Sequence, residues 1–183
     1  MSNLTVQKKT SRAKTKAKST MEEVPCPTLM PPVPISAKGG SNNNTILTYS
    51  NGIQETRSGG SRAWRNNNPG NIRPGYLTGE IGSAGGFAVF SSEAMGQAGI
   101  VENLQRPQYS QLTVFGAVSK WAPPSDGNST AVYQARVQKA TGIDGQTLIS
   151  SLNQSQLEAV ANAIRNEEGW IVGKRTCSVQ KTQ

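Results

Sequence analysis

Apolar residues recur at helical spacing through the second half of the chain. The first such stretch begins at Ser91 or Ser92 and places four apolar residues on one face: Ala94, Ala98, Val101 and Leu104. A second stretch runs from Thr113 to Trp121, and two prolines follow it closely. Because residues on one face of a helix repeat every 3.6 positions, both stretches predict amphipathic helices.

Two more helices are expected further along the chain. One follows the polar segment "SDGNST", contains Val132 and ends at Gly142, a residue typical of helix C-termini. The other opens at Ser155, and Glu158 three residues later indicates a capping box. A short helical turn is expected between them near "TLISSL".

Strand patterning is confined to short segments. "TILTY", followed by Ser-Asn-Gly, predicts a strand and turn, and "GFAVF" predicts a second brief strand. The Gly/Asn/Arg-rich segment between them predicts loop. We therefore expect a mainly α (α+β) domain over residues 45–173, with a loop-rich polar wall and a few short strands. A disordered basic and Pro-rich tail is expected over 1–44, and a flexible C-terminal tail over 174–183.

Charge is distributed unevenly along the chain. The formal net charge is +8, and six basic residues and no acidic residue lie among the first twenty. From residue 21 onward there are 13 basic and 11 acidic residues, so the folded part is close to neutral. This balance argues against a nucleic-acid partner for the domain. No apolar run is long enough to span a membrane, and no apolar region of a secretory signal peptide follows the basic start.

Histidine is absent from the sequence. Its absence excludes Ser-His-Asp and Cys-His catalysis and histidine-ligated zinc, and we expect neither a metal nor another cofactor. Cys26 and Cys177 lie near opposite ends, and we expect them to be free thiols in flexible flanks. Any catalysis would therefore rest mainly on carboxylates, the usual alternative acid and base groups.

Two adjacent carboxylates end the last predicted helix, in "IRNEEGW". On a helical wheel, Glu168 falls in the middle of the apolar face and Glu167 falls at its border. Burial should raise the pKa of Glu168 and keep it protonated near neutral pH, as a general acid requires. Alternatively the helix frays at Gly169, or Glu168 pairs with an arginine such as Arg65 or Arg73.

Polar loops supply the other candidate site residues. Asp126 and Asn128 lie in "WAPPSDGNSTAVY", a long loop before Tyr133, where a turn or helix cap is the plain alternative. Asn68 and Asn71 belong to "RNNNPGNIR", whose amides offer donors and acceptors suited to neutral sugars. The same asparagines could equally satisfy their own turns.

The chain resembles lysozyme-like peptidoglycan hydrolases of bacteria and phages, including glycoside hydrolase effectors of type VI secretion systems. The resemblance rests on "RNNNPGNIR", "GGFAVFSSEAMGQAGI", "KWAPPSDGNSTAVY" and "AIRNEEGW", in that order. It implies a small lysozyme-like helical fold and cleavage of β-1,4 bonds in peptidoglycan glycan strands. Muramidase, glucosaminidase and lytic transglycosylase activities all stay open. In peptidoglycan glucosaminidases the glutamate helix comes first, so its last place here would fit a circular permutation.

The resemblance also ranks the acidic residues. The glucosaminidase pattern favours Glu167, three residues before Trp170, whereas lysozymes with glutamate directly before glycine favour Glu168. We expect Glu168 to be the acid, Glu167 to be its rival, and Asp126 to be the candidate second carboxylate. Asn68, Asn71, Asn128 and Tyr133 are the candidate substrate-binding residues.

Delivery and partners follow from the same resemblance. We expect injection into the periplasm of a target bacterium by components of a secretion apparatus, or release at phage lysis. A producing cell would then need a periplasmic immunity protein. The alternatives are a non-catalytic wall-binding or structural component of a phage or secretion device, and a nucleic-acid binder that uses the basic tail.

Overall fold

The structure is a computed structural model that describes residues 20–27, 32–127 and 129–181. In this part of the chain, seven strands form one mixed sheet in the order β1-β7-β4-β3-β2-β5-β6. The strands are β1 (Thr20–Val24), β2 (Pro34–Gly39), β3 (Thr45–Tyr49), β4 (Gln54–Ser58), β5 (Glu80–Ala84), β6 (Phe87–Phe90) and β7 (Lys174–Lys181). Neighbouring strands are antiparallel except for β2 and β5, which run parallel.

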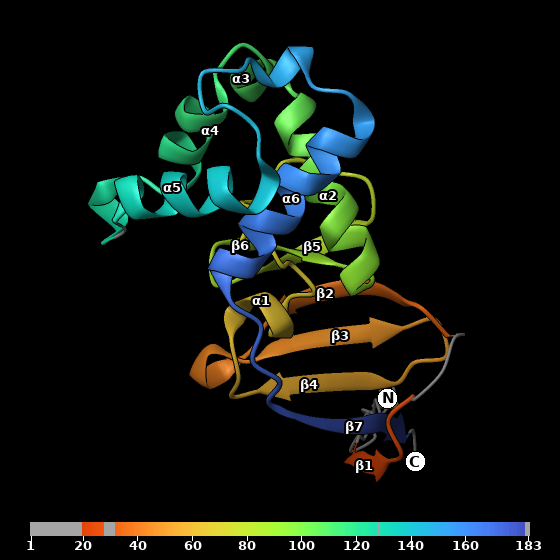
Figure 1. The fold of residues 1–183 in the computed structure, drawn as a ribbon. Helices are drawn as coiled ribbons and strands as arrows, with labels where there is room; N and C mark the ends of the chain where they lie inside the picture. The colour runs from red at the N-terminus through yellow and green to blue at the C-terminus, as the bar shows by residue number, and fades with distance from the viewer. Residues whose placement is uncertain (1–19, 28–31, 128, 182–183) are drawn as a thin grey trace, which may run out of the picture.

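All the α-helices except the short first one gather at one end of this sheet, beyond β5 and β6, while β7 and β1 lie at the other end (Figure 1). The α-helices are α1 (Arg62–Arg65), α2 (Glu93–Gln105), α3 (Pro107–Ser110), α4 (Val114–Trp121), α5 (Thr130–Thr141) and α6 (Gln154–Glu168). Short 3-10 turns are η1 (Ser41–Asn43), η2 (Pro124–Asp126) and η3 (Ile149–Ser151). No helix among the described residues is both long and apolar enough to cross a membrane.

The expectation of a mainly helical domain is wrong. The seven-stranded sheet makes this an α+β fold, which consists of the sheet and the helices together. Strands such as β4, "QETRS", and β7, "KRTCSVQK", lack the apolar alternation by which a half-buried strand is recognised. Hydrogen-bonded pairing with neighbours and a polar cluster hold them instead.

The segments expected to be tails also contain strands. β1 and β2 lie within 1–44, and β7 occupies most of 174–183. The first nineteen residues, with the basic run, lie outside the described residues. Pairing of β7 with both β1 and β4 brings the two ends of the domain into one sheet.

The expectation of two free thiols is wrong as well. Cys26 and Cys177 form a disulfide, with their Cα atoms 5.1 Å apart across a sequence separation of 151 residues. Pairing of β1 with β7 places Val24 opposite Cys177 and brings Cys26 close to it. The sequence did not reveal this proximity because the strand pairing that creates it was not predicted.

A buried carboxylate ties the strands together in the middle of the sheet. Glu55 is fully buried and accepts hydrogen bonds from Tyr49 at 2.6 Å, Arg57 at 2.6 Å and Arg175 at 2.7 and 2.8 Å. Burial alone would raise the pKa of Glu55, but the hydrogen bond from Arg175, the charge of Arg57 and the Tyr49 hydroxyl lower it to about 2. The cluster therefore joins β3, β4 and β7 through an ionised group.

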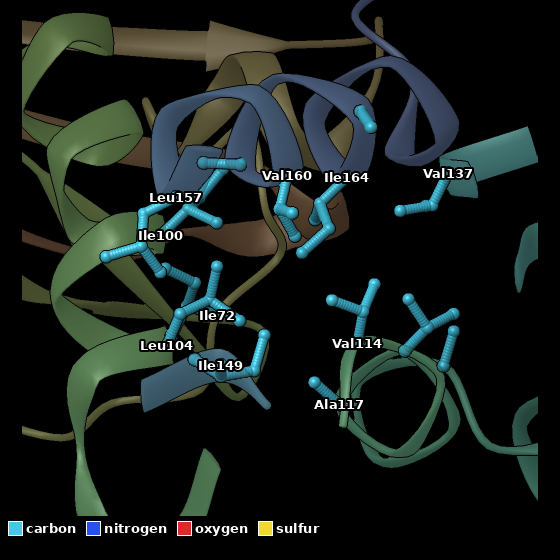
Figure 2. Packing of buried hydrophobic residues seen from close by; sticks show 14 of the residues in the cluster. Ile72, Ile100, Leu104, Val114, Ala117, Val137, Ile149, Leu157, Val160 and Ile164 are labelled. Atoms are coloured by element: carbon cyan, nitrogen blue, oxygen red, sulfur yellow. The ribbon is translucent and has the colours of Figure 1, made fainter. Parts of the chain in front are cut away.

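The main hydrophobic core lies among the helices. Figure 2 shows Leu157, Val160 and Ile164 of α6 facing Ile100 and Leu104 of α2. Each of these side chains is at most 5% exposed. Full burial of a side chain of this size contributes about 1.5–3 kcal/mol, so this packing fixes the course of α6 toward its C-terminal end.

Helix ends follow the sequence signals closely but not everywhere. Ser92 and Thr113 cap α2 and α4 through their side chains, and Gly142 ends α5 with a positive φ of 69°, as expected. The last helix begins earlier than predicted. Its capping box pairs Asn153 with Gln156, because an asparagine side chain serves as well as serine in that position.

Candidate functional site

A groove of about 600 Å³ opens where α6, α4 and the loop after α1 meet. Its lining includes residues that lie far apart in the sequence: Arg62, Asn71, Arg73, Phe87, Arg106, Tyr109, Lys120, Trp121, Pro123 and Glu168. Glu168 is the only carboxylate among the described lining residues. The groove therefore brings one acidic group together with several cationic and aromatic side chains.

Glu168 is held by two hydrogen bonds from distant parts of the chain. The side-chain amide of Asn71 donates to Oε2 at 2.9 Å, and the Tyr133 hydroxyl lies 3.3 Å from Oε1. Glu168 is the last residue of α6, and Gly169 leaves the helix with a φ of 76°. The helix thus continues as far as Glu168, as the wheel required, and does not fray before it.

Burial dominates the electrostatics of this carboxyl group. It raises the pKa of Glu168, while hydrogen bonds from Asn71 and Tyr133 and the charge of Arg62 oppose the rise without cancelling it. Glu168 therefore keeps its proton to a higher pH than an ordinary glutamate, as predicted. Burial first, and then the charge of Glu168, also raise the pKa of Tyr133, which stays a neutral donor.

Glu167 has different surroundings, although it is the next residue. Its carboxylate pairs with Arg136 of α5 at 2.9 Å, and its side chain is 21% exposed. Arg65, one arginine considered as a partner for Glu168, instead donates to the carbonyls of Gly59 and Gly60. The structure therefore agrees with the helical wheel, which placed Glu168 in the middle of the apolar face and Glu167 at its border.

The asparagine-rich turn divides into buried and groove-facing residues. Asn68 is fully buried, donates to the carbonyls of Ile72 and Ala88, and accepts from the Ile72 amide. Its amide is therefore satisfied within the protein and does not line the groove. Asn66 and Asn67 are also buried and donate to the carbonyls of strands β5 and β6. Asn71 alone of these asparagines lines the groove.

These buried amides have a positioning effect. By attaching the turn to β5 and β6, they set the place from which Asn71 reaches across to α6. Asn71 has a φ of 46°, a left-handed conformation that asparagine tolerates better than most residues. Its side-chain oxygen accepts from Arg62 Nε at 3.1 Å, so one amide links the arginine to Glu168.

The loop before α5 places fewer described side chains at the groove than expected. Asp126 belongs to η2, but its side chain lies outside the described part, as does the whole of Asn128. Ala122 and Pro123 of the same loop line the groove. Tyr133 is buried, and its hydroxyl lies 3.3 Å from both the Ile164 carbonyl and Glu168 Oε1, so it is placed to hold the end of α6 more than to contact substrate.

Sequence reasoning missed the cationic and aromatic wall. Arg62 and Arg73 both lie over the ring of Phe87, at 3.5 and 5.3 Å from its centre. Trp121 donates its indole N–H to the carbonyl of Gly70 at 3.0 Å. The arginines near the asparagine-rich turn were the only available signal, because the Phe87 ring that Arg62 and Arg73 share comes from a separate strand.

A second hollow of about 500 Å³ lies beside the sheet, lined by Tyr49, Trp64 and Trp170 among others. Its one described lining carboxylate, Glu93, is paired with Arg165. The groove at Glu168 is the better candidate for acid catalysis because its carboxyl group has a raised pKa and no ion-pair partner among the described residues. The described residues contain no cluster of side chains that could hold a metal ion. No protein-family model and no curated protein matches this chain.

Proposed function

We propose that this protein is a glycosidase that cleaves β-1,4 bonds of the peptidoglycan glycan strand, with Glu168 as the general acid. The proposal is carried by one observation: a carboxyl group with a raised pKa faces a groove of about 600 Å³ and is oriented by Asn71 and Tyr133. A protonated carboxyl group of this kind can give its proton to the departing glycosidic oxygen. The sequence resemblance points to the same substrate.

A second chemical group acts together with the general acid Glu168, and it is supplied in one of two ways. Glycosidases commonly use a second carboxylate, and Asp126 is the candidate from the neighbouring loop. Otherwise the substrate supplies the group, either through its acetamide or through the hydroxyl that closes an anhydro ring. Glu168 then protonates the leaving oxygen and afterwards accepts a proton, so one carboxylate suffices.

The place of action forms part of the proposal. We propose that the protein acts in the periplasm of a target bacterium, delivered by a secretion apparatus or at phage lysis, and that an immunity protein protects its producer. The Cys26–Cys177 disulfide supports a destination outside the reducing cytoplasm.

The products of cleavage test the proposal. Purified peptidoglycan is incubated with the full chain, reduced with borohydride and analysed by mass spectrometry. Reduced muramic acid identifies a muramidase, reduced glucosamine a glucosaminidase, and an anhydro-muramic end a transglycosylase. If no glycan fragments are released while the protein still binds the wall, it is a wall-binding component and the proposal fails.

A further inference from the structure

The groove around Glu168 is strongly cationic, although the domain as a whole is close to neutral. Four of its lining residues are basic: Arg62, Arg73, Arg106 and Lys120. Glu168 is the single acid among its described lining residues, and its raised pKa reduces its negative charge. The groove thus concentrates positive charge that neutral sugar hydroxyls do not require.

Arg106 does not contribute free positive charge to the groove. Its guanidinium pairs with Glu102 at 3.1 Å and donates to the carbonyls of Gly75 and Tyr76. It therefore anchors the 75–76 loop to α2. The argument below rests on the other three cations.

Arg62 and Arg73 converge on one wall of the groove. Both guanidinium groups lie over the Phe87 ring, and Arg62 uses its Nε to donate to Asn71. In the described part of the chain, neither arginine has a carboxylate within salt-bridge distance. Bringing two like charges to one ring is unfavourable, and an anion bound between them would relieve the repulsion.

Lys120 adds a third cation from α4. It lies over the ring of Tyr109, 5.5 Å from its centre, and likewise has no salt-bridge partner among the described residues. The three positive charges therefore border the space next to Glu168, and none of them forms a salt bridge with a described residue. Guanidinium groups bind carboxylates through paired, parallel hydrogen bonds, which gives the site geometric selectivity as well as charge.

We propose that Arg62, Arg73 and Lys120 form a subsite for a carboxylate attached to the sugar chain, so that the substrate is an acidic glycan and not a neutral chitin-like one. This inference rests on the proposed function and adds to it the substrate group that the groove recognises. In peptidoglycan, the carboxylate comes from the lactyl group of a muramic acid without a peptide or from the stem peptide. Both sources present the same chemistry to the two guanidinium groups.

Binding measurements separate these possibilities without relying on turnover. In the Glu168→Gln background, calorimetry compares four ligands: glycan strands without peptides, the same strands with carboxylates converted to methylamides, peptide-bearing fragments, and chitohexaose. We expect the carboxylate-bearing strands to bind about tenfold more tightly than their methylamides, with the difference shrinking as salt rises. Whichever carboxylate-bearing ligand binds more tightly identifies the natural source of the anion.

Variants then assign the preference to the groove. Adding Arg73→Gln or Lys120→Gln should reduce the tenfold ratio toward one, whereas Lys139→Gln, an exposed charge on α5 outside the groove, should leave it unchanged. Equal affinity for carboxylate and methylamide strands would overturn the proposal, as would an unchanged ratio in both groove variants. Duplex DNA binding lost in the same variants, without any glycan preference, would assign the cations to nucleic acid instead. Failure of the proposed function appears separately, as absence of cleavage by the parent protein.

Discussion

Asn71 donates its side-chain amide to Glu168 at 2.9 Å, across 97 residues of sequence. This contact joins the loop after α1 to the end of α6 and favours the ionised carboxylate, so it limits the rise in the pKa of Glu168. Asn71 is thus a positioning residue whose effect should be visible in a pH profile.

Replacing Asn71 with glycine should shift that profile toward higher pH. Glycine accepts the left-handed backbone at this position, so Asn71→Gly removes the amide with little conformational strain. A general acid works while protonated, and losing the amide raises the pKa of Glu168 further. The alkaline limb of kcat/KM should therefore move upward while kcat falls about tenfold. A lower rate with an unmoved limb would show that Asn71 has only a structural role.

Glu168→Gln should stabilise the protein near neutral pH. Because the pKa of Glu168 is raised in the folded state, its ionisation opposes folding, and that cost appears as pH rises through the folded pKa. Below the unfolded pKa both states are protonated, so the cost disappears. Thermal unfolding should give a higher Tm for Glu168→Gln than for the parent at pH 7 and equal values near about pH 3.5. A lower Tm at pH 7 would contradict the account of burial.

Glu55 should affect the pH dependence of stability in the opposite direction to Glu168. Its folded pKa is lowered to about 2, so its ionisation contributes stability above the unfolded pKa, and that stability is lost as pH falls from there toward 2. Glu55→Gln would leave Arg57 and Arg175 without their carboxylate, and we expect a loss of about 3–5 kcal/mol at pH 7, measured by urea unfolding. Glu158→Gln, an exposed change on α6, is the control and should cost less than about 0.5 kcal/mol.

The disulfide should stabilise the domain by about 2–4 kcal/mol, because it closes a long segment of the unfolded chain. Reductant should lower the Tm of the parent protein. The double variant Cys26→Ser/Cys177→Ser should start at the lower Tm and be insensitive to reductant. Equal Tm values for the oxidised parent and the double variant would contradict a stabilising role.

The sequence predicts a helix or strand well where one face of that element is buried, because burial leaves a regular spacing of apolar residues. Helices such as α4 and α6 bury one face against a core, so their apolar spacing was readable. The face predicted for α2 was partly wrong, because Ala94 and Ala98 are exposed while Gly96, Gly99 and Ile100 are buried. Strands β3 and β6 were predicted from "TILTY" and "GFAVF" and are confirmed. Strands β4 and β7 were not predicted, because they carry polar residues on both faces and pair with each other across a long sequence separation.

The site was partly readable for the same reason. The wheel separated Glu168 from Glu167 because it reports the buried face of a single helix. It could not reveal that Asn68 is buried and Asn71 faces the groove, since that difference depends on how the turn docks on β5 and β6. The arginine wall depends on Phe87, which lies on a strand well separated from both arginines.

The most direct test of the central claim compares the two neighbouring glutamates in lysis of purified peptidoglycan. Loss of a general acid should lower the rate of Glu168→Gln by about 10²–10⁴-fold, with the substrate still bound. Glu167→Gln removes only an exposed pair with Arg136 and should stay within a few-fold of the parent. Near-normal lysis by Glu168→Gln, with Glu167→Gln inactive, would contradict the assignment.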